Sequence, residues 1–541
     1  MTFDYIIVGA GSAGCLLANR LSANPEVSVL LLEAGGPDSK LEIHVPAAYS
    51  KLNKTKVDWA FSTEPQKHVL NRRMYLPRGK TLGGSSSTNA MAYVRGNAAD
   101  YDDWAAMGNP GWGYQDVLPY FKKSENNEQI SNEFHGKNGE LNVTFAQKFK
   151  TPFAEAFVEA CQQIGLPKND DYNGANQNGA GFFQFTIKDQ KRHSAAVAFL
   201  KPVMNRPNLK VITHALVENV VIENDKATGV NFKTGRSASQ KAVAKKEVIL
   251  SAGAYQSPQL LMLSGVGDAD YLKSQGIVCK KHLPGVGQNL QDHLFMNVSA
   301  TSTVLEGQNH HLTALNQIKG LAEFFIKKTG PLTISPLEAV AFFNLDNFKD
   351  RVDFQFHFAP IHLGEGYDID MYNTDTYPKK EDGYTILPTL LHPKSRGFVG
   401  LHSKDPTAAP LIQPNFLSEE DDLSKLLKGT KLAVETLSQP AFESLQRKLV
   451  APPFRQSDDE IVLHIKKMLE TVYHPVGTCK MGSDGMAVVD AQLRVHGIEN
   501  LRVIDASIMP KIMSGNTNAP TYMIAEKGAA MITGTSAPIG H

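Results

Sequence analysis

The stretch that decides the fold is Tyr5-Ile6-Ile7-Val8-Gly9-Ala10-Gly11-Ser12-Ala13-Gly14. Its first four residues form a short apolar run, which is typical of a strand buried on both faces of a parallel sheet. The glycine-rich turn is followed by an apolar helical segment over residues 15–21 and by a second apolar run over residues 27–32. This order predicts a strand–helix–strand unit with a right-handed crossover.

The turn has the spacing G-x-G-x-x-G, which lets the backbone approach a pyrophosphate while the helix N-terminus supplies free N–H donors. Glu33 ends the second strand, where a carboxylate can accept hydrogen bonds from both ribose hydroxyls of an adenosine. The unit therefore predicts a dinucleotide site, and FAD and NAD both stay open because they share the same ADP half. The predicted residues are Gly9, Gly11, Ser12, Ala13, Gly14, Glu33 and Ala34.

The composition argues against several other classes of protein. Among 541 residues, 55 Lys and Arg balance 55 Asp and Glu, so the net charge is zero and we expect no nucleic-acid partner. The four cysteines lie far apart without a C-x-x-C spacing, which argues against a disulfide framework or a zinc site. We expect free thiols, a reducing compartment and no bound metal.

The sequence shows no targeting or membrane-spanning segment. Its first residues lack the features of a signal peptide, and no apolar run reaches the ~18 to 20 residues that span a bilayer. The expected location is the cytoplasm. Peripheral contact with the inner membrane stays open, because a docking patch does not require a long apolar run.

Segments beyond the first unit predict more strands and two helices. Residues 209–223 and 247–252 are apolar runs that predict further strands of the first sheet, and Ser257-Pro258 predicts a helix start. Apolar and polar residues alternate over residues 352–358, a period of two that is typical of an antiparallel strand. Ser418 and Asp421 have the spacing of a capping box before another helix.

A second loop rich in glycine and serine covers residues 78–91. Together with the first turn, it resembles the glucose-methanol-choline (GMC) flavin oxidoreductases, specifically their choline-dehydrogenase-like, alcohol-oxidising branch. The resemblance covers nearly the whole chain. It rests on residues 79–96 and 253–265, which match the two signatures of the family, on residues 283–293, and on the C-terminal blocks 473–482 and 516–521.

The resemblance implies an α/β plus α+β fold, in which a Rossmann-like FAD-binding domain with a parallel sheet is interleaved with a substrate domain. The substrate domain is expected to have an antiparallel sheet flanked by helices. The FAD-binding segments are expected at 1–150, 201–300 and 461–541, and the substrate segments at 151–200 and 301–460. The resemblance adds these cofactor-binding residues: Arg78, Thr81, Gly83, Gly84, Ser85, Asn89, Ala90, Met91, Val217, Ala252, Gly253, Asp505, Ala506, Asn518, Pro520 and Thr521.

Some members of this family hold FAD covalently through a histidine in the second loop. The corresponding position here is Thr88, which has no imidazole nitrogen to form that bond. The expected cofactor is therefore non-covalent FAD.

The resemblance also assigns the catalytic acid/base to His474 and its partner over the flavin to Asn518. Oxidising an alcohol removes a proton from oxygen and a hydride from carbon, so a base must lie within ~3 Å of the hydroxyl while the carbon faces flavin N5. His474 has a suitable intrinsic pKa, and Asn518 would donate an amide N–H to the developing alkoxide. His357 is kept as a minor pocket candidate, and His293 is expected to be a packing residue.

The predicted reaction is FAD-dependent oxidation of a primary alcohol to an aldehyde. A flavin-containing lyase or photodecarboxylase of the same architecture is the main alternative. A nicotinamide-linked dehydrogenase and a non-catalytic FAD-binding module are further alternatives. The identity of the alcohol stays open, as does the electron acceptor, which could be oxygen, a quinone or a redox protein.

Overall fold

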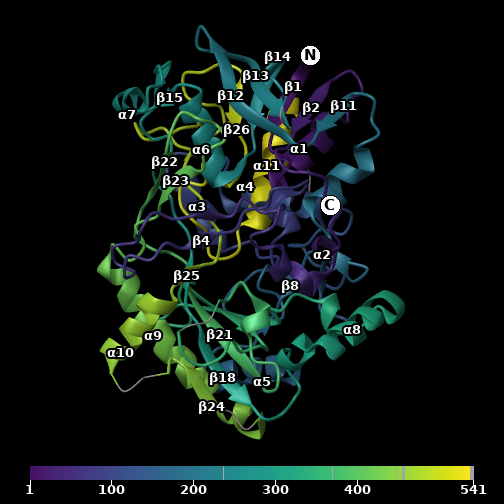
Figure 1. Ribbon diagram of the computed structural model, residues 1–541, viewed down its shortest axis with the longest axis vertical. Helices are drawn as coiled ribbons and strands as arrows, with labels where there is room; N and C mark the ends of the chain where they lie inside the picture. Colours follow the sequence, from purple (N-terminus) through teal and green to yellow (C-terminus); the bar gives the residue numbers. More distant parts are fainter. Residues whose placement is uncertain (236, 368–369, 446–447, 454–456, 536–541) are drawn as a thin grey trace.

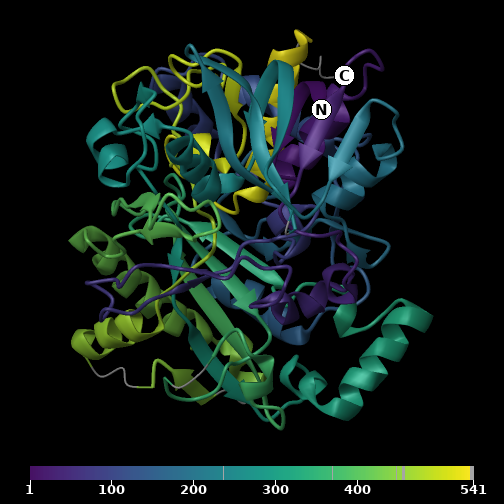
Figure 2. The same ribbon diagram turned by 45° about the horizontal axis from the view of Figure 1, so that its top comes forward.

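The computed structural model describes residues 1–235, 237–367, 370–445, 448–453 and 457–535. Figures 1 and 2 show two large sheets, one in the upper part of the molecule with strands in purple and teal, the other in the lower part with strands mainly in green. The upper part holds the strands of the predicted dinucleotide unit and the C-terminal helix. The chain passes from one part to the other several times.

The first sheet has the strand order β11-β2-β1-β14-β13-β12, with β26 paired to β14. Its β1, β2, β11, β14 and β26 pair in parallel, whereas β12, β13 and β14 form an antiparallel meander. Residues 5–8 of β1 are buried, as a strand covered on both faces requires. The strands are β1 (Thr2–Val8), β2 (Val29–Leu32), β11 (Leu209–Ile212), β12 (Ala215–Glu223), β13 (Lys226–Thr234), β14 (Gln240–Leu250) and β26 (Leu501–Val503).

The helix α1 (Ser12–Leu21) follows β1 and packs against the C-terminal helix α11 (Asn518–Thr533). The helix α11 also packs against α4 (Tyr114–Ser124), and its residues 519–530 are buried. Because α1 and α11 lie together, the first turn and the C-terminal block meet although they are about 500 residues apart in the sequence.

The helix α6 (Gly253–Leu263) corrects one prediction, because it begins before Ser257-Pro258 and has Pro258 inside it. Proline lacks the N–H that would bond the carbonyl four residues earlier, here that of Ala254. The Thr478 hydroxyl donates a hydrogen bond of 2.6 Å to that carbonyl oxygen instead. A distant side chain therefore satisfies the freed carbonyl and makes the interior proline tolerable.

The second sheet has the order β24-β18-β21-β20-β19-β7, and β17 joins β21 to β25. All of its pairings are antiparallel. The helices α5 (Pro152–Gln163) and α9 (Glu420–Leu437) cover one face, and α10 (Asp458–Met468) packs on α9. The strands are β7 (Gly179–Phe182), β17 (Leu294–Phe295), β18 (Val298–Ser302), β19 (Ala339–Phe343), β20 (Phe354–Ala359), β21 (Asp382–Leu390), β24 (Lys448–Ala451) and β25 (Glu470–Thr471).

The period of two predicted for residues 352–358 is present in β20, but neither face is in water. Phe354, Phe356 and Phe358 pack into the core of the second part, and Gln355 and His357 on the other face are buried as well. The polar face therefore turns toward the interior between the two parts. The predicted fold class, a parallel α/β sheet interleaved with an antiparallel sheet flanked by helices, is confirmed. The exact segment boundaries stay predictions.

The predicted capping box at Ser418 is wrong. The residue before α9 is Glu419, and no side chain caps the helix. Asp422, in the first turn of α9, is fully buried. Its carboxylate accepts hydrogen bonds from the backbone N–H groups of Lys394 at 2.7 Å and Ser395 at 2.9 Å. The first turn of α9 therefore holds a neighbouring loop, and its own N–H groups have no side-chain cap.

Candidate active site

A cavity of about 570 Å³ is lined by residues of both large sheets. At one end lie the first glycine turn and the carboxyl ends of β1, β2 and β14. At the other end lie β17, β20, β21 and the segment 472–475. Such a position, at the carboxyl ends of parallel strands, is where α/β sheets bind dinucleotides.

The first glycine turn is packed so closely that side chains are excluded. A Cβ at Gly14 would lie 1.9 Å from the carbonyl oxygen of Gly9, and Gly9 itself has a φ of +99°. Gly11 is different, since a Cβ there would lie 3.9 Å from its nearest neighbour, the carbonyl oxygen of Ser251. Gly11 precedes α1 without a side-chain cap, and Ser12 and Ala13 line the cavity, so the N–H groups of the first turn face it.

Glu33 holds the strand–helix–strand unit together. Its two carboxylate oxygens accept hydrogen bonds from the backbone N–H of Ala10 at 2.9 Å and of Gly35 at 2.8 Å. Burial raises the pKa of Glu33 to about 7, although these two bonds oppose the shift. The side chain also lines the cavity. The carboxylate that holds the turn is therefore also in place for the predicted contact with a ribose.

Most of the predicted cofactor residues line this cavity, and four do not. Thr81 instead donates a hydrogen bond to the carbonyl oxygen of Gly36 at 3.0 Å, and Gly83 packs against Ser87. The predicted residues that line the cavity are Gly9, Gly11, Ser12, Ala13, Glu33, Ala34, Arg78, Gly84, Ser85, Asn89, Ala90, Met91, Val217, Ala252, Gly253, Asp505, Ala506, Asn518 and Thr521; those outside its lining are Gly14, Thr81, Gly83 and Pro520.

Asp505 follows β26 and forms bonds within the protein. One carboxylate oxygen accepts from the N–H of Gly253 at 2.8 Å and the hydroxyl of Ser257 at 2.6 Å, and the other accepts from the N–H and hydroxyl of Ser507. The carboxylate therefore fixes the start of α6 against the end of β26. Burial raises the pKa of Asp505, and these hydrogen bonds oppose the shift.

His474 lies in the wall at the other end of the cavity, half-buried, after Tyr473, whose φ of 63° is uncommon for an aromatic residue. Its backbone N–H donates to Asp292 Oδ1 at 2.8 Å. Its ring Nδ1 lies 3.0 Å from Nδ1 of His293, and its Nε2 lies 3.1 Å from the amide nitrogen of Asn516. Burial, together with His293, His357 and Arg78, holds the pKa of His474 well below its ordinary value.

His293 fixes which nitrogen of His474 carries the proton. His293 is fully buried, and burial lowers its pKa to about 3, so the ring is neutral and has one N–H. Its Nε2 lies 3.0 Å from the carbonyl oxygen of Met513, which only accepts hydrogen bonds, so Nε2 carries that proton. His293 Nδ1 must then accept from His474 Nδ1–H. The lone pair of His474 is therefore at Nε2.

The predicted partner of His474 needs correction, because the amide beside its Nε2 belongs to Asn516 and not to Asn518. Asn518 is the first residue of α11, and its Oδ1 accepts a hydrogen bond of 2.7 Å from the Ser12 hydroxyl at the start of α1. The two asparagines are separated only by Thr517, and the helix start turns their side chains to different ends of the cavity. The N-T-N repeat alone could not distinguish them.

Sequence reasoning also placed His293 among packing residues, whereas it contacts His474 directly. His357 does line the cavity, as expected for a pocket residue. Its Nδ1 lies 3.1 Å from the Thr389 hydroxyl, which itself donates to the carbonyl oxygen of Leu387. His357 Nδ1 is thus the donor, and its buried Nε2 has no hydrogen-bond partner among the described residues.

The comparisons with known proteins agree with this geometry. Residues 3–295 and 393–525 match the N-terminal and C-terminal regions of the GMC oxidoreductase family. An alcohol dehydrogenase [acceptor] of Pseudomonas putida is 45% identical over 98% of this chain and 95% of its own length. The mitochondrial choline dehydrogenase of Homo sapiens is 43% identical over 99% of this chain and 90% of its own. The chain is a GMC oxidoreductase.

A solved structure extends the agreement to the fold of this GMC oxidoreductase. A formate oxidase variant of Aspergillus oryzae, studied for its FAD modification, superposes with a TM-score of 0.92 at 28% identity and covers 98% of both chains. The likeness thus includes both large sheets.

The residues of this GMC oxidoreductase fit FAD. The open side of Gly11 and the uncapped start of α1 suit a pyrophosphate at one end of the cavity. At the other end, the buried Oδ1 of Asn516 has no hydrogen-bond partner among the described residues. Across the residues that the structure describes, no group of three His, Cys, Asp or Glu side chains is placed to hold a metal ion. No helix in the same residues is long and apolar enough to cross a bilayer.

Proposed function

We propose that this protein oxidises an uncharged primary alcohol to an aldehyde with non-covalently bound FAD, and that His474 removes the hydroxyl proton. The observation that carries the proposal is the proton arrangement of the histidine pair. His474 Nε2 faces the cavity as a lone pair because His293 accepts the proton at Nδ1. A neutral imidazole with an exposed lone pair is the form that a general base needs.

Asn516 supports the same reaction. Its amide nitrogen lies 3.1 Å from His474 Nε2 and donates to that lone pair, so a hydroxyl that displaces this hydrogen bond meets a base and a neutral donor together. The amide can stabilise the oxygen as negative charge develops, and it does not compete for the proton. Arg78, which lines the cavity, adds a fixed positive charge near this end and favours an anionic oxygen.

Bound FAD supplies the acceptor for the hydride that leaves the alcohol carbon. The residues that would hold its ADP half are those of the first glycine turn and Glu33, and the second loop with Arg78 would hold the region nearer His474. The lining histidines of the described cavity are His357 and His474, and both lie at the substrate end. Thr88 lines the cavity at the position of the covalent link, which supports a dissociable cofactor.

The lining near His474 supports an uncharged alcohol as substrate. Phe295, Leu337 and Leu387 give this end an apolar surface. The carboxylates that line the described cavity, Glu33 and Asp505, belong to the dinucleotide end. The quaternary ammonium of choline gains from anionic or aromatic groups around it, and here only the aromatic half of that requirement is present. The acceptor, the cytoplasmic location and peripheral contact with the inner membrane stay predictions.

Anaerobic mixing of the FAD-loaded protein with 1-butanol, 1-octanol, benzyl alcohol and choline tests the proposal. We expect an uncharged alcohol to bleach the flavin absorbance in one turnover and its aldehyde to form in equal amount. Bleaching with choline alone would contradict the substrate class. If none of the alcohols bleached the flavin, a lyase or a decarboxylase, which leaves the flavin without net reduction, would be favoured, although the relatives described above are named as dehydrogenases and an oxidase.

Acid precipitation tests the cofactor linkage separately. We expect the flavin to remain in the supernatant, because Thr88 cannot form a bond to the ring. Yellow colour in the washed pellet would contradict non-covalent binding.

A further inference from the structure

The feature with no role so far is a helical run beside the second sheet. The helix α8 (Ala314–Ala322) continues directly into the π-helical turn η6 (Glu323–Lys327), and Figure 1 shows α8 projecting from the lower part of the molecule. Five of the fifteen strongly exposed large apolar side chains in the described residues belong to this run. They are Leu315 (74% exposed), Ile318 (67%), Leu321 (41%), Phe325 (52%) and Ile326 (80%).

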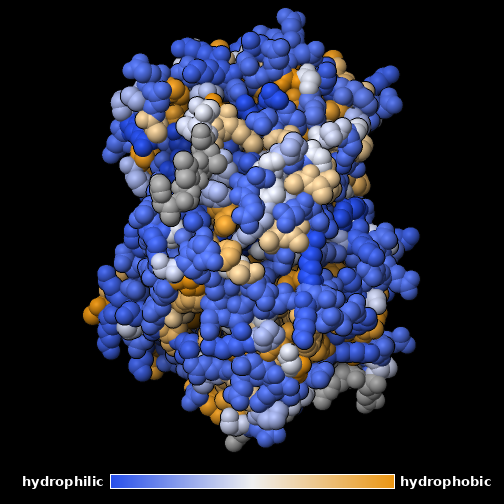
Figure 3. Space-filling model, turned by 180° about the vertical axis from the view of Figure 1, so that it is seen from behind, coloured by the Kyte–Doolittle hydropathy of each residue, from blue (hydrophilic) through white to orange (hydrophobic). Residues whose placement is uncertain are grey.

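These side chains form one face. Their spacing of three, three, four and one residues places them on a single stripe of a helix. The opposite face is the one that meets the protein, because Gly320 and Phe324 are buried and a Cβ at Gly320 would lie 3.7 Å from Leu332. A surface helix normally turns its apolar stripe inward. Here the stripe points outward, while most of the face shown in Figure 3 is hydrophilic.

The stripe has a positively charged border. Lys319, Lys327 and Lys328 are exposed, and none of them forms an ion pair with the residues that the structure describes. The acid of the run is Glu323, so the local charge is about +2 over residues 314–328, from three lysines and one glutamate. An apolar stripe bordered by lysines is typical of helices that lie in the headgroup region of anionic membranes.

The helix lies next to the wall of the cavity. Lys51 Nζ lies 3.4 Å from Gln317 Oε1 of α8. Lys51 belongs to the 3₁₀ segment η1 (Pro46–Leu52), whose Tyr49 and Ser50 line the cavity. One short segment therefore separates the apolar stripe from the site.

We infer that the run from Ala314 to Lys327, called the docking helix below, binds the protein to an anionic lipid surface beside the cavity. A second copy of the chain fits the face less well, because a twofold contact would bring the same lysines against each other. A membrane supplies the opposite charge. At the bilayer surface, the cavity wall would lie near the apolar phase in which a lipophilic alcohol or a quinone concentrates. The inference concerns binding to lipid and does not depend on the proposed reaction.

Flotation of the FAD-loaded full-length protein with vesicles tests the inference. One set of vesicles contains phosphatidylcholine with 30 mol% phosphatidylglycerol and the other phosphatidylcholine alone. We expect binding to the anionic vesicles, weaker binding to neutral ones, and further weakening at high salt. The variant with Ile318→Asp and Ile326→Asp should lower the affinity for anionic vesicles at least about tenfold, since each isoleucine would otherwise bury its side chain in lipid.

Val278→Asp is the matched control, because Val278 is 81% exposed and lies outside the docking helix. It should bind vesicles as the unmodified protein does, and turnover of a water-soluble short alcohol should be the same in all three proteins. Equal flotation of the double variant and the control would overturn the inference. So would a dimer in sedimentation without vesicles that only the double variant dissociates, because the face would then be covered by a second copy.

Discussion

Two histidines in this molecule, the half-buried His474 and the buried His135, have opposite proton preferences. His474 in the cavity wall has a pKa well below its ordinary value, since burial acts together with His293, His357 and Arg78. His135 is 4% exposed, and burial again disfavours its charge, but the hydrogen bonds that its ring donates to Asp171 and Glu125 outweigh burial and raise the pKa. Burial alone therefore does not decide the charge of a histidine. The neighbours decide it.

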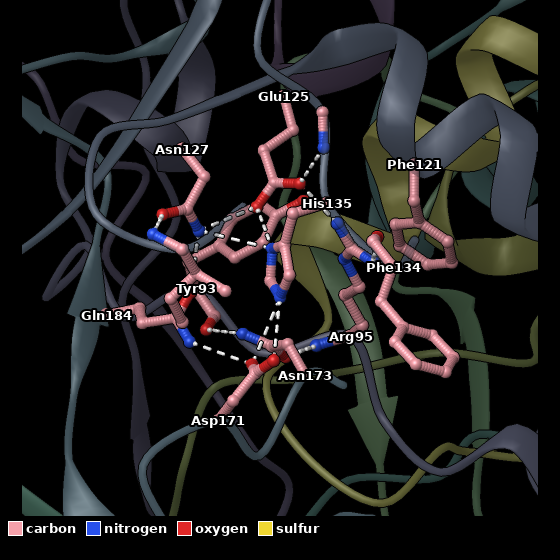
Figure 4. Close-up of polar contacts among 12 residues, drawn as sticks. Tyr93, Arg95, Phe121, Glu125, Asn127, Phe134, His135, Asp171, Asn173 and Gln184 are labelled. Carbon is pink, nitrogen blue, oxygen red and sulfur yellow. Dashed lines mark hydrogen bonds and ion pairs between the residues drawn. The ribbon is translucent and has the colours of Figure 1, made fainter. Parts of the chain in front are cut away.

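The surroundings of His135 form a dense buried network, drawn in Figure 4. His135 Nδ1 lies 2.9 Å from Glu125 Oε1, and its Nε2 lies 3.0 Å from Asp171 Oδ1. Glu125 also forms an ion pair with Arg95, and both side chains are almost fully buried. The network joins segments near residues 95, 125–136 and 171. It is a set of paired charges that stabilises the fold, whereas the His474 pair is neutral and leaves His474 Nε2 unprotonated, with the Asn516 amide as its hydrogen-bond donor.

The largest expected effect is on activity at the neutral pair. His474→Ala should lower kcat/KM by about 10² to 10⁴-fold, which is the usual contribution of a general base. The FAD content and the melting temperature should stay near those of the unmodified protein, because His474 contributes little packing to the core. Stopped-flow reduction by the alcohol measures the rate. Retention of more than a tenth of the activity would show that another group takes the proton.

The next effect is on stability at the charged network. Arg95→Met leaves Glu125 buried without its main positive partner, so we expect the free energy of unfolding to fall by about 3 to 5 kcal/mol. Lys428→Met is the matched control, because Lys428 and Asp346 form an exposed pair that contributes at most about 1 kcal/mol. Urea unfolding measures both. Similar losses in the two variants would contradict the contrast between the regions.

A smaller effect is expected from the second histidine of the neutral pair. His293→Ala removes the acceptor for His474 Nδ1–H, so the lone pair is no longer held at Nε2 and kcat should fall about tenfold. His293→Asn offers a carbonyl oxygen in nearly the same place and should recover part of the loss. In the unmodified protein, kcat/KM should begin to fall with decreasing pH only below pH 6.5, as the lowered pKa of His474 requires. If His293→Asn were no more active than His293→Ala, the acceptor role would be contradicted and His293 would be a packing residue.

The two asparagines provide a finer comparison within the cavity. Asn516→Ala should lower kcat by about five- to tenfold with little change in FAD affinity, because the lost N–H lies beside His474. Asn518→Ala should instead weaken FAD binding with little change in kcat, since its side chain bonds Ser12 at the start of α1. Titration of FAD into the apoprotein and steady-state kinetics separate the two. The reverse pattern would restore Asn518 as the partner of His474.

The smallest effect is the pH dependence of stability from His135. Its folded-state pKa is raised above the unfolded value of about 6.5, so its contribution is fully present below that pH and is lost as the pH rises through the folded pKa. Glu125 and Asp171 have lowered pKa values, so their contributions are present at neutral pH and are lost as the pH falls. His135→Gln should remove the alkaline loss only. Melting temperatures between pH 5 and 9 measure it, and an unchanged slope would contradict a charged His135.

Local chemistry in the sequence was sufficient for the dinucleotide half of the site. Gly9, Gly11 and Gly14 with the apolar runs around them predict the turn correctly, because backbone conformation and burial there depend on neighbouring residues. The same reasoning was wrong at Ser418 and at Ser257-Pro258. In both places a side chain of the helix or of a distant segment forms a tertiary hydrogen bond that the local pattern does not contain: Asp422 binds the loop at Lys394, and Thr478 binds the carbonyl oxygen of Ala254.

The amino-acid sequence by itself was enough for the strand–helix–strand unit, for the family and for the prediction that His474 is the base, since each depends on short motifs whose residues are close together in the chain. Only the tertiary structure decided that Asn516 and His293 meet His474, because these contacts span 42 and 181 residues. It also decided that the apolar stripe of α8 points outward, because a helical period does not say which face meets the protein. The charge state of a histidine inside the protein is also decided by the tertiary structure, because it follows from partners that the fold alone brings together.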